Sequence, residues 1–235
     1  METSTGPLIE ARELTKIYPR KREAPVEAVS RVNLRIFRGE FLAVVGRSGC
    51  GKTTLLNLIG TLDRPTSGRV VFEDKDLNGF SNRDLALLRR QKVGFIFQTF
   101  NLLPALTALE NIEVALAPTH MSREEREEKA KILLSLFELT DKANHLPLEL
   151  SAGQQQKVAI ARAVARDPPV ILADEPTGEM DPTTGGEIVA KLVELNQKRN
   201  VTIVVASHGA FPYEVASRVL FMKDGKIVSK EEAGY

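Results

Sequence analysis

The nine residues GRSGCGKTT, at positions 46–54, constrain the fold of this chain more than any other segment. They follow an apolar run at residues 41–45 that is typical of a buried strand, and they lead into a helical pattern at residues 53–59. The segment satisfies G-x-x-x-x-G-K-[ST], a pattern in which glycines let backbone N–H groups turn inward around phosphate oxygens and the following helix adds its positive end. A strand, a phosphate-binding loop and a helix in this order predict an α/β fold.

The loop residues have separate expected roles at a bound nucleotide. Lys52 reaches the β- and γ-phosphates, and the Thr53 hydroxyl is a ligand of Mg²⁺. Cys50 stands at a variable position, where it is a small filler whose oxidation would hinder nucleotide entry. The alternative interpretation is a glycine-rich strand-to-helix turn with an exposed lysine. The predicted nucleotide-binding residues of this loop are Gly46, Arg47, Ser48, Gly49, Cys50, Gly51, Lys52, Thr53 and Thr54.

Further apolar runs indicate a mostly parallel sheet. Runs rich in valine, isoleucine and phenylalanine occupy residues 41–45, 93–97, 170–173 and 201–206. Helical patterns lie between them, and such alternation favours parallel strands. Segments with period-two alternation, which predict an antiparallel sheet beside the parallel one, are residues 8–18, 32–37 and 69–72. Asp224 and Gly225 mark a hairpin near the end of the chain.

Residues 99–150 have a different character, because prolines interrupt them and one stretch reads as a charged surface helix. Ser122 and Glu125 can form a capping box, and the charge run at residues 123–131 is interpreted as a solvated helix face. We predict one globular unit. Its β and core part comprises residues 1–98 and 158–235, and its helical subdomain comprises residues 99–157.

Composition limits the classes of partner. Lys and Arg total 32 and Asp and Glu total 31, so no overall charge draws the chain to nucleic acid, and no nucleic-acid partner is expected. A single cysteine and polar first residues predict that the protein is located in the cytosol. No apolar run reaches membrane-spanning length. A role in a membrane process would therefore require docking on a separate subunit.

Two adjacent carboxylates end one of the apolar runs. The segment VILADEPT places Asp174 and Glu175 where a strand leaves the core, at the sheet edge where open α/β folds bind ligands. Asp174 would hold Mg²⁺ through its water shell, and Glu175 would polarise the water that attacks the γ-phosphate. The alternative is a solvated pair of acids at a strand end.

Polar residues also end two other buried-looking strands. Gln98 follows VGFIF and is expected to touch Mg²⁺ and the attacking water. His208 follows VTIVVAS and is expected to hydrogen-bond the γ-phosphate. Each residue taken alone has the alternative interpretation of an ordinary strand-terminal polar residue. Their combination with the loop and the carboxylates favours the functional one.

Five segments together resemble the ATP-binding-cassette ATPases over essentially the whole chain. They are GRSGCGKTT, FQTFNLLP, LSAGQQQKVAIARA, ILADEPTGEMD and VVASH, in the order and approximate spacing of that family. The resemblance implies a RecA-like P-loop NTPase core with an antiparallel β subdomain and an α-helical subdomain. LIGTLDRPTSG and NLLPALTALENIEVAL resemble the subfamily that serves lipoprotein release and macrolide-type efflux.

The resemblance implies that LSAGQ binds a nucleotide held by a second copy of the chain. Ser151 and the N–H of Gly153, with Gln154, would stand at the start of a helix over residues 154–165, where the helix dipole favours an anion. That anion would be the γ-phosphate in the partner's glycine-rich loop, so that two ATP molecules lie between two subunits arranged head to tail. The alternative is that Ser151 simply caps its own helix, which we expect in either case.

Two further residues carry roles implied by the resemblance. Tyr18, in LTKIYP, matches the aromatic residue that stacks on adenine, and its alternative is a packed surface aromatic. Asp181, after TGEM, matches a loop that links the two sites across the dimer. Asp181 also precedes Pro182, which predicts that it caps the next helix.

The chain departs from the family pattern at a few positions. Ala152 replaces the first glycine of the usual signature, which adds a Cβ where glycine-only geometry or close approach to phosphate is expected. Glu179 adds a negative charge to the loop before Asp181, Gly209 replaces a frequent aspartate, and Lys157 replaces a common arginine. None of these changes removes a predicted catalytic residue.

We interpret the chain as an Mg²⁺-dependent ATPase subunit whose ATP-bound dimer drives a separate integral membrane permease, to whose cytoplasmic side it binds. Its expected cofactors are ATP and Mg²⁺. A permease helix would dock in the groove between the subdomains, and the loop after Gln98 would transmit closure. One alternative is a soluble ATPase of the same family that acts on DNA or ribosomes. Another is a small-molecule phosphotransferase, which leaves residues 150–163 without a purpose.

Overall fold

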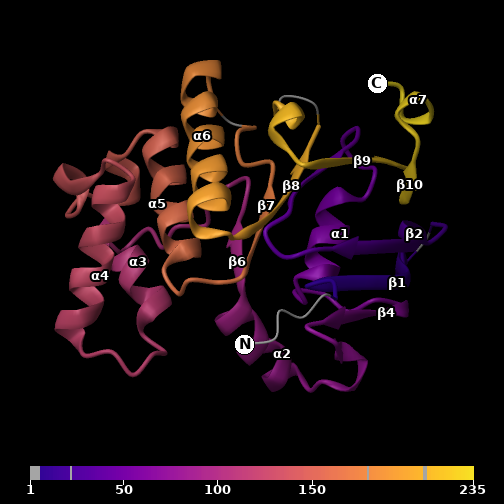
Figure 1. Cartoon of the computed structure of the whole chain (residues 1–235), viewed down its shortest axis with the longest axis horizontal. Coiled ribbons are helices and arrows are strands. Elements are labelled where there is room, and N and C mark those ends of the chain that lie inside the picture. Colours follow the sequence, from indigo (N-terminus) through magenta and orange to yellow (C-terminus); the bar gives the residue numbers. More distant parts are fainter. Residues whose placement is uncertain (1–5, 22, 179, 209–210) are drawn as a thin grey trace.

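The computed structural model describes residues 6–21, 23–178, 180–208 and 211–235. Figure 1 shows a central sheet with helices on one side and a second sheet with further helices on the other. The strands are β1 Ile9–Tyr18, β2 Val26–Ile36, β3 Phe41–Val45, β4 Ser67–Phe72, β5 Lys75–Asp76, β6 Val93–Ile96, β7 Val170–Asp174, β8 Thr202–Ser207, β9 Arg218–Lys223 and β10 Lys226–Val228. The helices are α1 Lys52–Ile59, α2 Asn82–Lys92, α3 Ala108–Leu116, α4 Arg123–Leu136, α5 Ala152–Val164, α6 Pro182–Arg199 and α7 Lys230–Ala233. Short 3₁₀ turns occupy Leu77–Gly79, Thr140–Lys142, Pro147–Glu149 and Tyr213–Val215.

The larger sheet is mostly parallel, as predicted. In the described residues its strand order is β10-β9-β3-β8-β7-β6. Strands β9, β3, β8, β7 and β6 run parallel, and β10 pairs with β9 in antiparallel fashion. The α/β fold class is confirmed, and the predicted strands and hairpin of this sheet are confirmed to within one or two residues at their ends. Because parallel strands end at the same edge, the carboxyl ends of β3, β8 and β7 lie next to one another.

The smaller sheet is antiparallel, with the order β2-β1-β4-β5 in the described residues. The expected strand at residues 32–37 is wrong in extent, since β2 begins at Val26 and pairs with β1 along most of its length. The pairing contains register shifts, and Glu13 and Arg31 have positive φ angles of 48° and 46°. Such bulges interrupt the period-two alternation, so the first half of β2 carries no clear strand pattern.

Alternate residues of the central strands pack into two separate hydrophobic cores, one on each face of the sheet. Ile203 and Val205 of β8 pack with buried residues of α3, α4, α5 and α6. Val204 and Ala206 of the same strand pack with α1, α2 and the antiparallel sheet. Helices α1 and α5 therefore cover opposite faces of the central sheet (Figure 1). α5 also runs unbroken across residues 157 and 158, where the division into subdomains is proposed.

Helix α4 begins as the sequence predicts. Ser122 accepts a hydrogen bond from the Glu125 backbone N–H, and the Glu125 carboxylate accepts one from the Ser122 N–H. All six residues from Arg123 to Glu128 are charged, and the buried residues of the helix are confined to Ala130, Leu133 and Leu134. The charge run is thus a solvated face.

Glu10 is a buried carboxylate that joins β1 to β2. Its oxygens accept hydrogen bonds from Arg12 Nη2 at 2.6 Å and from Arg35 Nε at 2.8 Å. Only 9% of the Glu10 side chain is exposed, whereas both guanidinium groups are about half exposed or more. The hydrogen bonds from Arg12 and Arg35 lower the pKa of Glu10 to about 2.

We expect Glu10→Gln to lower the free energy of unfolding by about 1 kcal/mol at pH 7, a small figure because solvent screens the exposed arginines. The folded pKa lies below the ordinary value of 4.5, so this stabilisation is complete above about pH 4.5 and is lost as the pH falls toward 2. Urea denaturation at several pH values measures the difference in the free energy of unfolding between the variant and the wild type. Glu214→Gln is the control, because Glu214 is exposed. A difference that stays constant down to about pH 3 would contradict this assignment.

Asn111 on α3 is fully buried and organises the segment before that helix. Its Oδ1 accepts from the Leu103 N–H at 2.8 Å, and its Nδ2 lies 3.1 Å from the Leu103 carbonyl, 2.9 Å from that of Leu106 and 3.0 Å from that of Thr107. These bonds satisfy backbone groups that are partly buried.

Asn111→Leu is therefore expected to lower the free energy of unfolding by about 2 kcal/mol, because it removes the hydrogen-bond partner of several partly buried backbone groups. Urea denaturation provides the measurement. Asn144→Leu is the matched control, since Asn144 is exposed, and it should change stability by less than about 0.5 kcal/mol. Equal losses in the two variants would show that Asn111 has no special part in the fold.

Candidate functional site: a nucleotide-binding edge of the central sheet

The loop between β3 and α1 requires glycine at specific positions. Gly49 and Gly51 have φ angles of 80° and 106°, which L side chains rarely adopt. A Cβ on Gly51 would lie 2.0 Å from the Ala28 carbonyl oxygen, and a Cβ on Gly46 would lie 2.3 Å from that of Met222. The backbones of β2 and β9 thus hold the curl of the loop before any ligand binds.

Lys52 is the first residue of α1 and lies under this loop. Its side chain is only 5% exposed, and its Nζ donates to the carbonyls of Gly46 at 2.8 Å and Arg47 at 3.3 Å. Nζ is also 3.5 Å from Glu175 Oε1. Cys50, in the same loop, is buried, and burial raises the pKa of its thiol. The loop therefore encloses a cation, while its cysteine has little thiolate character.

Asp174 ends β7 and has an unpaired buried oxygen. Within the described residues its Oδ1 has no hydrogen-bond partner. Burial raises the pKa of this carboxyl group, the charge of Glu175 adds to that effect, and Thr53 and Lys52 partly offset it. A buried carboxylate oxygen beside a threonine hydroxyl fits a hydrated Mg²⁺, which prefers oxygen ligands and neutralises the carboxylate.

At Glu175 the chain leaves the end of β7 and turns toward β8. Its φ of 48° lies in the left-handed region, a strained conformation for a glutamate, and its N–H donates to the Ala206 carbonyl at 2.9 Å. Glu175 Oε2 is 2.5 Å from Nδ1 of His208, which follows the end of β8. Lys52, Glu175 and His208 thus form one connected group at the carboxyl ends of the strands.

Gln98 lies beside the same group. A Cβ on Gly178 would stand 3.9 Å from Gln98 Nε2 and 3.5 Å from Glu175 Cβ, so both side chains border Gly178. Gln98 follows β6, the edge strand. The polar ends of β6, β7 and β8 that the sequence singles out therefore meet at one edge of the sheet, next to the glycine-rich loop.

Tyr18 ends β1 near the start of α1. Its hydroxyl donates to Asp63 Oδ2 at 2.9 Å, and Lys16 Nζ lies 5.0 Å from the centre of its ring. Burial is the main cause that raises the pKa of Tyr18, and the Thr54 side chain interacts with its hydroxyl. The ring is 37% exposed. Tyr18 thus lies beside the glycine-rich loop with its ring partly open to solvent.

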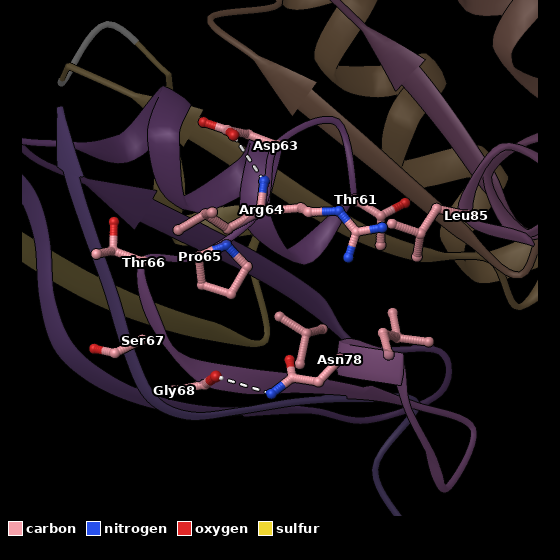
Figure 2. A pocket seen from close by; sticks show the side chains of 12 residues that line it. Thr61, Asp63, Arg64, Pro65, Thr66, Ser67, Gly68, Asn78 and Leu85 are labelled. Atoms are coloured by element: carbon pink, nitrogen blue, oxygen red, sulfur yellow. Dashed lines mark hydrogen bonds between the residues drawn. The ribbon is translucent and has the colours of Figure 1, made fainter. Parts of the chain in front are cut away.

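Asp63 also borders a pocket of about 340 Å³ that is separate from the glycine-rich loop. The segment LIGTLDRPTSG forms much of its wall. Figure 2 shows Asp63 and Arg64 on one side and Gly68 with Asn78 on the other. The Arg64 N–H donates to Asp63 Oδ1 at 2.7 Å, and Asn78 Nδ2 donates to the Gly68 carbonyl at 3.3 Å. The residues that line the pocket include none of residues 46–54, 174, 175 or 208.

Ser151 caps helix α5, as expected. The Gln154 N–H donates to Ser151 Oγ at 3.3 Å, and the Ser151 N–H donates to Gln154 Oε1 at 2.9 Å. The expected start of the helix at residue 154 is wrong, because α5 begins at Ala152. Among the described residues, no hydrogen bond joins Ser151 or Gln154 to the glycine-rich loop. This helix end does not complete the site of its own chain.

Ala152 differs from what the sequence suggests, and Gly153 has a packing contact in addition to its expected role. Ala152 is the first helical residue of α5 and has no positive φ, so the expectation of glycine-only geometry there is wrong. Gly153 has a packing role, since a Cβ would lie 2.3 Å from Thr184 Cγ2. Gly153 therefore lets α5 approach α6 closely.

Sequence reasoning missed two polar residues of α5 that connect it to the site. Gln156 is fully buried and its Nε2 donates to the Pro176 carbonyl at 2.8 Å, just after Glu175. Arg162 donates to the carbonyls of Phe100 at 2.8 Å and Asn101 at 2.6 Å, just after Gln98. The available signal was helical spacing, because Gln156 shares a face with the apolar Ile160.

Asp181 caps α6, as predicted, with its Oδ1 accepting from the N–H groups of Thr183 at 3.0 Å and Thr184 at 3.1 Å. Lys157, the other departure in α5, pairs with Glu187 of α6 at 2.9 Å. Glu179 and Gly209, which carry two of the noted departures, lie outside the described residues.

Comparison with known proteins establishes the family. The model of the ABC transporter family matches residues 29–178, which is more than half of the chain. The chain belongs to the ABC transporter family. It is thus an ATP-binding cassette of the P-loop NTPase class, a family whose members hydrolyse ATP with Mg²⁺ as cofactor.

Relatives of this ABC cassette include proteins of its own length and much longer ones. An uncharacterized ABC transporter ATP-binding protein of Methanocaldococcus jannaschii, MJ0796, is 44% identical over 229 residues, which is 96% of this chain and 97% of that protein. A macrolide export ATP-binding/permease protein, MacB, of Hyphomonas neptunium is 43% identical over 225 residues, which is 96% of this chain but 35% of that protein.

Solved structures of ABC cassettes have the same fold as this chain. A dimeric structure of MJ0796 in a post-hydrolysis state, bound to ADP and Pi, matches with a TM-score of 0.88, 44% identity, and coverage of 94% of this chain and 97% of that one. CbiO1 of Clostridium perfringens, part of the ABC transporter complex cbiONQ, matches with a TM-score of 0.83, 27% identity and coverage of 95% and 88%. In the described residues of the ABC cassette, no helix is both long enough and apolar enough to span a membrane.

Proposed function

We propose that the chain is the ATP-binding subunit of an ABC transporter, in which Mg-ATP binding and hydrolysis drive a separate membrane permease. The observation that carries this proposal is the connected group of Lys52, Glu175 and His208 beside the uncompensated oxygen of Asp174. A cation, a base and a metal-binding carboxylate at the mouth of a phosphate loop are the parts that ATP hydrolysis requires.

The residues that would bind Mg-ATP come from four strand ends. The glycine-rich loop, residues 46–54, would hold the phosphates, and Tyr18 would stack on the adenine. Thr53, Asp174 and Gln98 would hold Mg²⁺, which when bound supplies charge neutralisation at the β- and γ-phosphates.

Glu175 would act as the base that accepts a proton from the attacking water. Its carboxylate is held between Lys52 and His208, so its orientation is set by two partners. His208 is therefore proposed to position Glu175 as well as to hydrogen-bond the γ-phosphate. Glu175 lies at the strained start of the segment after β7, where Gln156 donates to the carbonyl of the next residue, Pro176.

A second copy would complete each site. Helices α1 and α5 cover opposite faces of the sheet, and Ser151 makes its hydrogen bonds within its own helix end. Ser151, Gly153 and Gln154 would meet the γ-phosphate held by the partner's loop, and Asp181 would link the two sites. Dimeric structures of MJ0796 support the pairing of two copies.

The permease would place the subunit at the cytoplasmic face of a membrane. Relatives that combine an ATP-binding part with a permease in one protein support such a partner, as does membership of CbiO1 in a transporter complex. Macrolide-type efflux or lipoprotein release is the narrower assignment that we propose. The reported relatives are transporter components, and none of their names describes action on DNA or ribosomes.

Phosphate release and subunit association test the proposal together. The purified chain with Mg-ATP should release free phosphate, and sedimentation should show a dimer that depends on Mg-ATP when hydrolysis is blocked. Transfer of the phosphoryl group to a small molecule would instead indicate a phosphotransferase. Hydrolysis by a chain that binds ribosomes or DNA, and no membrane protein, would favour the soluble alternative.

A further inference from the structure

The pocket of about 340 Å³ beside Asp63 has both an apolar and a polar lining. Its apolar side chains are each at most 5% exposed, and they are Leu58, Val70, Leu77 and Leu85. Its exposed polar residues include Thr66, Ser67 and Asn78. A cavity of about 150 Å³ holds one benzene molecule, and ligand pockets begin at about 300 Å³. The pocket therefore has room for a small molecule with an apolar body.

Arg64 supplies a positive charge on one wall of the pocket. Its Nη2 donates to the Phe80 carbonyl at 2.7 Å and to Asn82 Oδ1 at 3.0 Å, so the side chain is anchored to the start of α2. Both acceptors are neutral, and within the described residues Arg64 belongs to no ion pair. Figure 2 shows its side chain extending toward Thr61. The guanidinium is held in place and keeps N–H donors for an anion.

Asp63, the adjacent acid, does not neutralise Arg64. Its Oδ1 accepts a hydrogen bond from Lys16 Nζ at 2.7 Å, and its Oδ2 accepts one from the Tyr18 hydroxyl at 2.9 Å. Burial opposes ionisation of Asp63, but the hydrogen bonds from Lys16 and Tyr18 lower its pKa. The carboxylate is therefore charged and engaged with the end of β1. The charge that remains without a partner at the pocket is positive.

Thr61 adds an unsatisfied hydroxyl to the pocket wall. The residue is only 6% exposed, and among the described residues its Oγ1 has no hydrogen-bond partner. Its φ of 62° lies in the left-handed region, which is unusual for a β-branched residue. Arg89 holds this backbone by donating to the Thr61 carbonyl at 2.6 Å. A buried hydroxyl without a partner is destabilising, and a ligand acceptor that reached it would remove that penalty.

We propose that this pocket binds a small organic carboxylate with an apolar body. The carboxylate would pair with Arg64, and the apolar body would cover Leu77 and Leu85. Inorganic phosphate or sulfate would meet the positive charge but would leave the apolar side chains uncovered. A neutral apolar molecule would leave the guanidinium without an anion. A carboxylate on an apolar body satisfies both parts of the lining.

One loop links the pocket to the proposed adenine site. Asp63 accepts from Tyr18, and the Arg64 carbonyl accepts from Lys16 Nζ at 2.8 Å, so the loop that carries both lining residues is bonded to the end of β1. A carboxylate that fixes Arg64 would restrict the loop that holds Tyr18 and would tighten nucleotide binding by about fivefold. This coupling rests on the proposed function, because it assumes that Tyr18 stacks on adenine.

Binding of phenylbutyrate to the whole chain tests the inference, with the uncharged phenylbutyramide as the matched probe. Phenylbutyrate should shift the NMR signals of the Gly68 and Asn78 N–H groups with a Kd of about 1 mM. The amide should bind about tenfold more weakly, since it lacks the charge that pairs with Arg64. Arg64→Gln, which keeps a donor for the Phe80 carbonyl, should remove this preference for the carboxylate. Arg83→Gln at the exposed start of α2 is the matched control and should bind like the wild type.

A second variant leaves Arg64 unchanged. Ser67→Phe places a ring in the pocket, and because Ser67 is exposed the chain should still fold. It should abolish binding of phenylbutyrate. The same titration in saturating Mg-ADP measures the coupling, and phenylbutyrate should then bind about fivefold more tightly, because coupling between two sites is reciprocal.

The outcomes separate the inference from the proposed function. The absence of shifts at about 10 mM phenylbutyrate would overturn the inference. Equal binding of the acid and the amide, or equal binding by Arg64→Gln and the wild type, would also overturn it, and each of these results would leave the proposed function intact. Failure of the subunit to bind Mg-ADP would overturn the proposed function and the coupling, but not the carboxylate site.

Discussion

Glu175→Gln is expected to slow ATP hydrolysis by about 10²- to 10⁴-fold while ATP binding is retained. Glutamine has the size of glutamate and tolerates the same backbone, so the loop after β7 should keep its conformation. It cannot accept a proton from water, however, and it no longer carries the charge that lies 3.5 Å from Lys52 Nζ and 2.5 Å from His208 Nδ1. With hydrolysis blocked, the ATP-bound dimer should accumulate.

Phosphate release, equilibrium binding of ATP and sedimentation in Mg-ATP provide the measurements for Glu175→Gln. Glu194→Gln is the matched control, because Glu194 pairs with Lys191 and Lys198 of its own helix α6. Unchanged turnover in Glu175→Gln would refute the proposed base. Loss of ATP binding in the same variant would show that Glu175 acts in nucleotide binding rather than in proton transfer.

Lys52→Ala is expected to weaken ATP binding by about 30- to 1,000-fold, the range for the loss of a buried charge pair. The ammonium is 5% exposed and is the cation enclosed by the curl of the loop, where it donates to the Gly46 and Arg47 carbonyls. Its removal takes away both the charge that faces the phosphates and two hydrogen bonds that shape the loop.

Titration of Lys52→Ala with a fluorescent ATP analogue measures the affinity. Lys75→Ala, an exposed change on β5, is the control and should bind like the wild type. Lys52→Arg should not restore binding, since the branched guanidinium is larger than the buried ammonium that the Gly46 and Arg47 carbonyls hold. Wild-type affinity in Lys52→Ala would mean that the loop binds something other than a triphosphate.

The sequence predicts those parts of the structure that depend on neighbours along the chain. The glycine-rich loop, the capping residues Ser122, Ser151 and Asp181, and the buried strands are all encoded within a few residues, and the structure confirms them as structural features. The convergence of Lys52, Asp174 and Glu175 could also be expected, because parallel strands end at one edge.

Features that depend on contacts between distant segments could not be predicted in this way. The bonds from Gln156 to Pro176, and from Arg162 to Phe100 and Asn101, join segments 20 and about 60 residues apart. The packing of Gly153 against Thr184 likewise needs the positions of two helices. The expectation of glycine-only geometry at Ala152 was wrong for a related reason, since a glycine can serve close approach without needing a positive φ; close approach to phosphate at this position stays a prediction.

In the proposed dimer, Ser151 of one copy completes the site formed around Lys52 of the other, and the whole mechanism depends on this contact. Two variants test it together: Lys52→Ala, which disables the loop, and Ser151→Arg, which disables the opposite surface. Ser122→Arg is the matched control, because Ser122 caps α4 through the same kind of capping box.

Each of the two variants alone should have almost no ATPase activity. An equal mixture should recover about a quarter of the wild-type rate, because half of the dimers are mixed and each mixed dimer contains one intact site of two. A mixture that stays as inactive as its components, or a Ser151→Arg chain that remains as active as Ser122→Arg, would contradict the head-to-tail site.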